Sequence, residues 1–134
     1  MARSIQIKLF FIQFSSHSYL LHYMPFDGSE GSPIDANTAG DWTHAYQASV
    51  PGDAAKAMFF GRDILESILA QDGCKGIRFY FGLSSGSVDL KGTMQLVAVG
   101  ADHDENDQLG DGFIVADEAT SCPSACSQPN VLYN

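Results

Sequence analysis

The sequence predicts an α+β domain in which an antiparallel meander of three or four strands carries two helices packed on one face. Residues 76–83, 93–100 and 112–119 are rich in apolar, strand-forming residues, and polar or Gly-rich connections of hairpin length separate them. Residues 35–48 and 62–73 instead carry helical start signals and helical spacing. A layer of helices on one sheet is the simplest way to bury both kinds of apolar face. At 134 residues and 45% hydrophobic content, the chain suffices for one core.

The first predicted helix begins after Asp35, a suitable N-cap, and extends to about residue 48. Trp42 and Tyr46 lie four residues apart and therefore share a face of this helix. Gly40 lowers its intrinsic helix propensity. Residues 55–61, with the sequence AKAMFFG, are predicted to form a short strand.

The second predicted helix, residues 62–73, has the stronger pattern. Asp63 lies in its first turn, where a carboxylate interacts favourably with the helix dipole, and Gly73 stands where a C-terminal cap belongs. Its apolar residues form one stripe that we expect to face the sheet: Ile64, Leu65, Ile68 and Leu69.

Residues 76–83, GIRFYFGL, have the period of two that is typical of a strand with one buried face. Arg78 and Tyr80 belong to the other face. The residues expected on the buried face are Ile77, Phe79, Phe81 and Leu83.

The first 33 residues are predicted to be an extension outside the core, and residues 34–134 a single α+β domain. Arg3 and Lys8 with the run LFFIQF imitate the start of a secretory signal, but Gln13 interrupts the run and no small-residue cleavage site follows. The run is also shorter than the ~18 apolar residues that span a bilayer. Its alternating residues 5, 7, 9 and 11 favour an extra strand, the alternative being that translation starts at Met24. Without a secretion signal we expect a cytoplasmic location.

The charge of the chain is strongly negative. Seven Lys and Arg stand against sixteen Asp and Glu, a net charge of −9 that disfavours nucleic acid and membrane surfaces as partners. No basic residue follows Lys91, whereas acidic residues are frequent there. We expect Asp102, Asp104 and Asp107 to form an acidic interaction surface for a protein partner with a basic surface.

The run FFGRDILESILAQDGCKGIRFYFGL, followed by LVAVGAD and CPSAC, resembles a family of small uncharacterised bacterial proteins. These proteins share a helix with a tryptophan, a G-I-R-x-Y-x-G strand, a V-G-x-D turn and a C-terminal C-P-x-x-C motif. The resemblance spans residues 34–134 and implies the domain limits given above, but no mechanism. The matching positions are Trp42, Gly76, Ile77, Arg78, Tyr80, Gly82, Val99, Gly100, Asp102, Cys122, Pro123 and Cys126.

Two motifs resemble a catalytic serine site and a calcium-binding loop, but the neighbouring residues disfavour both functions. Residues 82–86 match G-x-S-x-G, but a nucleophile elbow needs a helix directly after the serine, and a polar stretch and a strand follow here. Asp102, Asp104 and Asn106 have the spacing of a calcium loop, yet Asp107 and Phe113 replace its turn Gly and closing Glu. A hairpin loop and a solvated acidic loop are favoured instead. With no nucleophile and base evident, our first functional hypothesis is a non-catalytic protein-interaction module.

The second hypothesis is a thiol-based metal-binding or redox protein that uses Cys122 and Cys126. These cysteines are four residues apart around Pro123, so a non-helical turn could join them as a disulfide, or they could ligate zinc with further ligands. Inert thiols are the third alternative. A complete zinc site with Cys74 and His103 is disfavoured, because strands of about seven residues separate the sheet ends by roughly 20 Å. We expect Cys122 and Cys126 to pair on oxidation in air and Cys74 to be a separate, mostly buried thiol.

Overall fold

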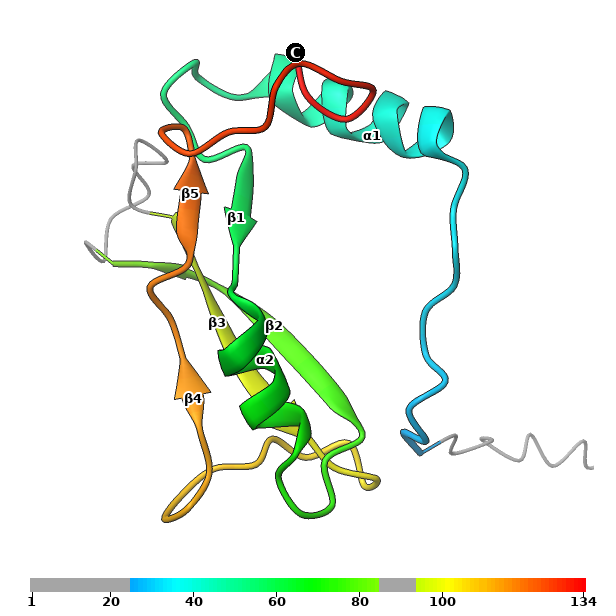
Figure 1. The fold of residues 1–134 in the computed structure, drawn as a ribbon, viewed down its shortest axis with the longest axis vertical. Helices are drawn as coiled ribbons and strands as arrows, with labels where there is room; N and C mark the ends of the chain where they lie inside the picture. Colours follow the sequence, from blue (N-terminus) through cyan, green and yellow to red (C-terminus); the bar gives the residue numbers. More distant parts are fainter. Residues whose placement is uncertain (1–24, 85–93) are drawn as a thin grey trace, which may run out of the picture.

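The computed structural model of the chain describes residues 25–84 and 94–134 (Figure 1). Two helices and two antiparallel sheets confirm the α+β class. One sheet has the order β2-β3-β4 and is the predicted three-stranded meander, whereas β1 and β5 form a separate two-stranded ribbon. The predicted strand near residues 5–11 and the end of the G-x-S-x-G motif lie outside the described residues. The elements are α1 (Ala36–Ser49), β1 (Ala57–Phe59), α2 (Arg62–Leu69), β2 (Gly76–Leu83), β3 (Met94–Ala101), β4 (Val115–Ala116) and β5 (Thr120–Cys122).

The meander is built mainly from the hairpin of β2 and β3, which pairs from Gly76 with Ala101 to Leu83 with Met94. β4 contributes only two residues, with Val115 opposite Val99. The predicted strand at 112–119 is therefore much shorter than expected. Glu118, with a φ of 57°, adopts the left-handed conformation, which interrupts an extended backbone.

The hydrophobic core lies between α2 and the meander. Ile68 of α2 and Ala98 of β3 are fully buried, and Ala116 of β4 completes the centre. Around it pack Phe60, Ile64, Cys74, Ile77 and Ile114. The helix ends at Leu69 with Ala70 as its C-cap, so Gly73 is not the cap that we expected. Gly73 instead takes a φ of 74° in the turn that leads to β2, where glycine avoids left-handed strain.

The predicted buried face of β2 is only partly covered. Ile77 packs against the core, but Phe79 is 42% exposed and Phe81 82% exposed. The lengths of the elements explain the difference. The eight residues of α2 span about 12 Å as a helix, whereas the eight residues of β2 span about 26 Å as a strand.

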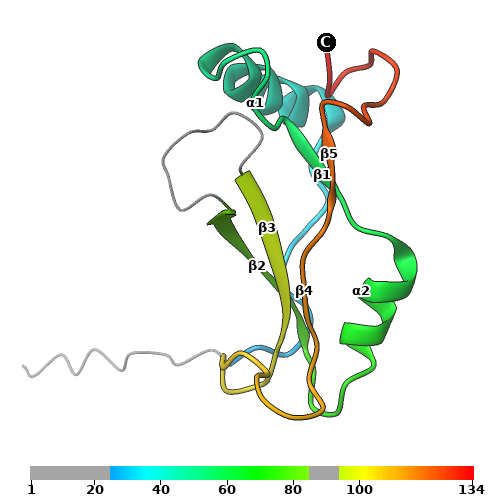
Figure 2. The same cartoon turned by 90° about the vertical axis from the view of Figure 1, so that its left-hand side faces the viewer.

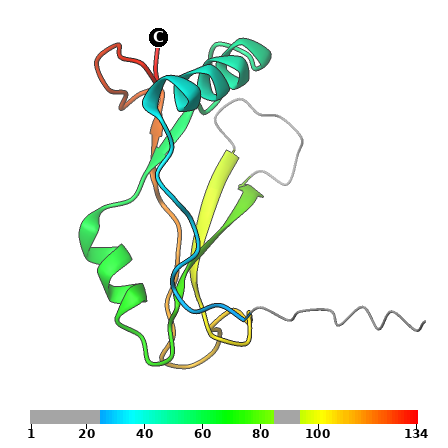
Figure 3. The same cartoon turned by 90° about the vertical axis from the view of Figure 1, so that its right-hand side faces the viewer.

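Helix α1 begins as predicted, since Asp35 Oδ1 accepts hydrogen bonds from the backbone N–H groups of Asn37 and Thr38. It does not share the face that α2 covers, however, and this part of the expected arrangement needs correction. α1 lies at the other end of the molecule against the C-terminal segment (Figure 3). A Cβ on buried Gly40 would meet the carbonyl oxygen of Val131 at 2.4 Å, so the glycine permits this close approach.

The ribbon of β1 and β5 was not predicted as a sheet. Ala57 pairs with Cys122 and Phe59 with Thr120, across more than sixty residues of sequence. The predicted strand at 55–61 thus pairs with the segment that carries the cysteine motif. The ribbon extends beyond β4, away from the loops at the lower end of the molecule (Figure 2).

Candidate functional site: the acidic end

The strongest concentration of charge lies where three connections meet at one end of the molecule (Figure 1). These connections are residues 25–30, the turn between α2 and β2, and the long loop between β3 and β4. Lys75 and Arg78 are the lysine and arginine found there, and His103 adds an imidazole. We call this region the acidic end, and its carboxylates are Asp27, Glu30, Asp72, Asp102, Asp104, Glu105, Asp107 and Asp111.

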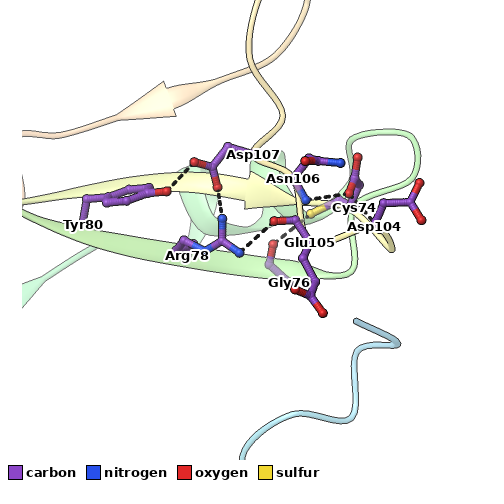
Figure 4. A network of polar contacts seen from close by, with 9 residues as sticks. Cys74, Gly76, Arg78, Tyr80, Asp104, Glu105, Asn106 and Asp107 are labelled. Carbon is purple, nitrogen blue, oxygen red and sulfur yellow. Dashed lines mark hydrogen bonds and ion pairs between the residues drawn. The ribbon is translucent and has the colours of Figure 1, made fainter. Parts of the chain in front are cut away.

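A polar network fixes the loop after β3 against strand β2 (Figure 4). Arg78 and Tyr80 are two residues apart in β2, so they lie on the same face of the strand. The Arg78 Nη1 group donates to Asp107 Oδ1 in an ion pair, and the Tyr80 hydroxyl donates to Asp107 Oδ2. Arg78 Nη2 also donates to the carbonyl oxygen of Glu105 at 3.0 Å. The loop is therefore held by side chains from the G-I-R-x-Y strand.

The neighbours of Arg78 stabilise the positive charge of its guanidinium group. The hydrogen bond with Tyr80 and the negative charge of Asp107 raise the pKa of the guanidinium above its usual value. The ring of Phe26 lies 5.5 Å from Arg78 Cζ, a cation–π distance. The backbone N–H of Phe26 donates to the carbonyl oxygen of His103 at 3.1 Å. Residue 26, placed by our prediction in the outer extension, therefore contacts the domain.

Asp102 organises the tip of the loop. Its Oδ1 accepts hydrogen bonds from the backbone N–H groups of Asp104 and Asn106, both at 2.9 Å. Its own N–H donates to the carbonyl oxygen of Asn106 at 2.9 Å. Glu105 has a φ of 67°, which closes the turn. The carboxylate of Asp102 thus accepts hydrogen bonds from the backbone of its own loop, as is typical of an Asx turn.

Residues 27–30 form a second turn of the same kind. Both carboxylate oxygens of Glu30 accept hydrogen bonds, from the N–H groups of Asp27 and Gly28 at 3.0 Å. Asp27 Oδ1 accepts from the N–H of Ser29 at 2.8 Å. The hydrogen bonds from Ser29 lower the pKa of Asp27, and that from the Asp27 backbone lowers the pKa of Glu30. Both carboxylates are fully exposed and remain charged at neutral pH.

The three residues predicted to form the acidic surface have different environments. The Asp107 side chain is only 18% exposed and is paired with Arg78. Asp102 is half-buried, and Asp104 is exposed. The structure therefore brings the three into one loop, but it gives Asp107 a structural role. The exposed negative charge comes from Asp104 together with neighbours that we did not single out, namely Asp27, Glu30, Asp72, Glu105 and Asp111.

A buried amide network supports the acidic end from inside. Gln108 is 5% exposed, and its Oε1 accepts from Gln71 Nε2 at 3.0 Å while its Nε2 donates to the carbonyl oxygen of Asp72 at 2.7 Å. Gln71 Oε1 accepts from the backbone N–H of Ile114 at 2.6 Å. The network joins the α2–β2 turn to the middle of the long loop, at Gln108, and to its end, at Ile114. No pattern in the sequence indicates this network, because a buried glutamine has no distinguishing spacing.

A hollow of about 410 Å³ lies beside the acidic end. Glu30 is its acidic lining residue, and Lys75 and Arg78 line it as well. Its other walls are formed by Phe26, Gly28, Leu69, Gly76, Ile77 and Ala101. The other exposed carboxylates of the acidic end do not line this hollow, an arrangement suited to contact with a surface. Within residues 25–84 and 94–134, no cluster of three or more His, Cys, Asp and Glu side chains could hold a metal ion.

Cys122 and Cys126 lie at the opposite end from the acidic loops, whereas Cys74 belongs to the α2–β2 turn at the acidic end. Cys122 and Cys126 form a disulfide with Cα atoms 4.7 Å apart, and Cys74 is a free thiol. This pairing agrees with the expected one. Cys74 is half-buried against the core, and its Sγ lies 3.2 Å from the carbonyl oxygen of Gly76. Cys122 also lines a cavity of about 450 Å³ between the ribbon, α1 and the C-terminal segment.

Comparison with protein-family models, curated proteins and solved structures finds no match to this chain. The described part of the chain has no helix with both the length and the apolar character needed to cross a bilayer.

Proposed function

We propose that the protein is a non-catalytic interaction module that binds a basic protein surface through its acidic end. The observation that supports this proposal is the gathering of exposed carboxylates from three separate connections on one end of the domain. Converging carboxylates produce a local negative potential that steers a basic partner and orients it on contact.

The hydrogen bonds of the acidic end favour such a role. Asp27, Glu30 and Asp102 accept bonds from backbone N–H groups of their own turns, which limits the motion of these turns. Asp107 neutralises Arg78, which would otherwise weaken the negative potential. A surface that is ordered before binding loses less conformational entropy when the partner arrives.

The net charge of the chain indicates which kinds of partner can bind. At −9 the chain repels phosphate backbones and anionic lipid surfaces, so a protein rich in Lys and Arg is the better fit. A cytoplasmic location belongs to this proposal. The acidic end would attract a partner without net charge only weakly.

Two triple variants with the same net charge test the proposal. The first, Asp72→Lys, Asp104→Lys and Asp111→Lys, reverses charge at the acidic end. The second, Asp41→Lys, Asp53→Lys and Asp117→Lys, changes exposed residues elsewhere. A synthetic Lys- and Arg-rich peptide is titrated into each protein while amide chemical shifts are followed by NMR.

We expect the shifts in the unchanged protein to map to residues 25–30, 71–75 and 102–111. The first variant should lose this binding and the second should largely keep it. Raising the ionic strength from about 0.1 M to about 1 M shortens the Debye length from about 10 Å to about 3 Å and should also abolish it. Equal losses in both variants would show that net charge alone attracts the peptide, and the proposal would then be wrong.

The disulfide favours a second candidate, a thiol-based redox protein that uses Cys122 and Cys126. A metal-binding role for the same thiols, with zinc as the ion, would require reduction and further ligands from a partner. Bound-metal content of the purified protein and a thiol count with and without reductant separate these roles. A redox role predicts one free thiol as purified under air and three after reduction, with no zinc under either condition.

A further inference from the structure

We infer that the outer half of β2 is a self-association surface, through which two copies of the chain pair their β2 strands antiparallel about a twofold axis. β2 has β3 as its neighbour on one edge, and the described strands provide no neighbour on the other edge. An open edge of this length is a template for another strand. This inference does not depend on the proposed function, because it concerns the end of the hairpin away from the acidic loops.

The two halves of β2 differ in how they are covered. Near Gly76 and Arg78, residues 26–30 approach the strand, and Phe26 lies under the Arg78 guanidinium. Beyond Arg78 the hairpin diverges from the β1–β5 ribbon and from the segment that leads to α1 (Figure 3). Here Phe79, Tyr80 and Phe81 are 42, 47 and 82% exposed.

This outer half lacks the features that normally protect an edge. Residues 79–84 and 94–101 contain no charged residue and no proline. Natural edge strands usually carry inward-pointing charges, prolines or bulges that prevent pairing. β4, at the other edge of the sheet, is protected by its length of two residues. The open edge therefore lies where the sheet is both long and apolar.

Charge decides how two such copies would pair. In an antiparallel pair centred near Phe81, the acidic ends point in opposite directions and lie on the order of 30 Å apart along the strands. That separation exceeds the Debye length of about 8 Å at physiological ionic strength, so their repulsion is screened. A parallel pair would bring both acidic ends together, with strands only about 5 Å apart. Antiparallel pairing is therefore the arrangement compatible with a chain of net charge −9.

The available area predicts a weak dimer. With about 150–250 Å² for each aromatic side chain, the exposed parts of Phe79, Tyr80 and Phe81 bury roughly 500–850 Å² over two copies. The strand backbones and Leu83 add to this area. The total is near or below the ~1,200 Å² that marks the lower limit of standard stable interfaces. We therefore expect a reversible dimer that forms only at high protein concentration.

Sedimentation equilibrium of the full chain and of two variants tests this inference. Phe81→Lys places like charges close to each other across the twofold axis. Phe59→Lys is the matched control, because Phe59 is also an aromatic strand residue and is 67% exposed, but it lies in β1. Circular dichroism should give similar melting temperatures for both variants, since neither side chain is buried.

We expect the unchanged chain to associate reversibly at concentrations up to about 1 mM, and more strongly at high salt. Phe81→Lys should weaken association at least tenfold, and Phe59→Lys should leave it unchanged. Amide hydrogen exchange at residues 79–83 should slow as the concentration of the unchanged chain rises. A monomer at all concentrations, or equal weakening by both variants, would overturn the inference. Protection of these amides at every protein concentration would also overturn the inference, because a segment of the same chain would then cover the edge of β2.

Discussion

The side-chain amide of Gln71 donates to the side-chain carbonyl oxygen of Gln108 across 3.0 Å, although 37 residues separate them. Gln108 is nearly fully buried, and both ends of its amide have partners. A satisfied buried amide specifies one arrangement of the chain around it, because every alternative leaves polar atoms unpaired. Through this pair the α2–β2 turn and the long loop after β3 are joined into one unit that carries the acidic end.

Replacing the buried amide should therefore destabilise the fold. Gln108→Leu leaves Gln71 Nε2 and the carbonyl oxygen of Asp72 without their partner, and we expect a loss of about 1–3 kcal/mol in the free energy of unfolding. Urea unfolding followed by circular dichroism measures it. Gln128→Leu, at an exposed position, is the control and should change stability by less than about 0.5 kcal/mol. Equal stability of the two variants would mean that the amide network contributes nothing.

Gly100 leaves the space that this network occupies. A Cβ at this position would lie 2.5 Å from Gln108 Oε1 and 2.7 Å from Gln71 Nε2. We expect Gly100→Ala to cost about 1–3 kcal/mol, because both amides must move from their hydrogen-bonded positions. Gly76→Ala is the matched control in the partner strand, where a Cβ would meet nothing within 4 Å. If thermal unfolding shows the same change for both, crowding at Gly100 is not important.

How far the sequence predicts this structure depends on whether the signal is local. The N-cap of Asp35, the helix α2 and the pairing of β2 with β3 are determined by local sequence patterns, and all three are present. Burial follows these patterns only in part, since Ile64 and Ile68 of α2 face the core whereas Leu69 is 51% exposed. The pairing of Ala57 with Cys122 joins distant segments of two or three residues, too short to have a recognisable period. The place of α1 depends on its contact with Val131, which no helical pattern indicates.

The candidate site follows the same division. Counting charges along the chain located the acidic loop, and the structure adds the acidic residues of two further connections. Counting could not distinguish Asp104, which is exposed, from Asp107, which pairs with Arg78. That difference depends on which strand faces the loop, and it emerges only from the three-dimensional arrangement.

The network around Asp107 should contribute to stability more than to binding. Asp107→Asn removes the charge that faces Arg78 but keeps the shape of the side chain, and we expect a loss of about 1–2 kcal/mol. Asp104→Asn removes one exposed charge and should change stability by less than about 0.5 kcal/mol. Binding of the basic peptide should show the opposite order. If Asp107→Asn reduced peptide binding without affecting stability, our distinction between the two aspartates would be wrong.

The turn at residues 27–30 should respond to acid. Because the pKa of Asp27 and that of Glu30 are lowered in the fold, each group stabilises the turn above its unfolded pKa, near 3.8 and 4.5. This contribution is lost as the pH falls through the folded values. Ser29→Ala removes the largest cause of the Asp27 shift, so its pKa should rise toward 3.8 while that of Glu30 stays unchanged. NMR titration of both carboxyl carbons measures this, and a Ser29→Ala variant with an unaltered Asp27 pKa would contradict it.

The disulfide should join Cys122 to Cys126 and leave Cys74 as the free thiol. After oxidation in air, mass mapping of alkylated peptides should find the label on Cys74, and reduction should expose all three thiols. The loop between the paired residues is short, so the loss of unfolded-state entropy is small and reduction should lower the free energy of unfolding by at most about 2 kcal/mol. Cys74→Ala is the control, because it should leave the bond intact while removing the label. A crosslink from Cys74 to Cys122 or to Cys126 would contradict the pairing. It would also require the β1–β5 ribbon to lie beside the end of β2 that packs against the core, which the fold does not allow.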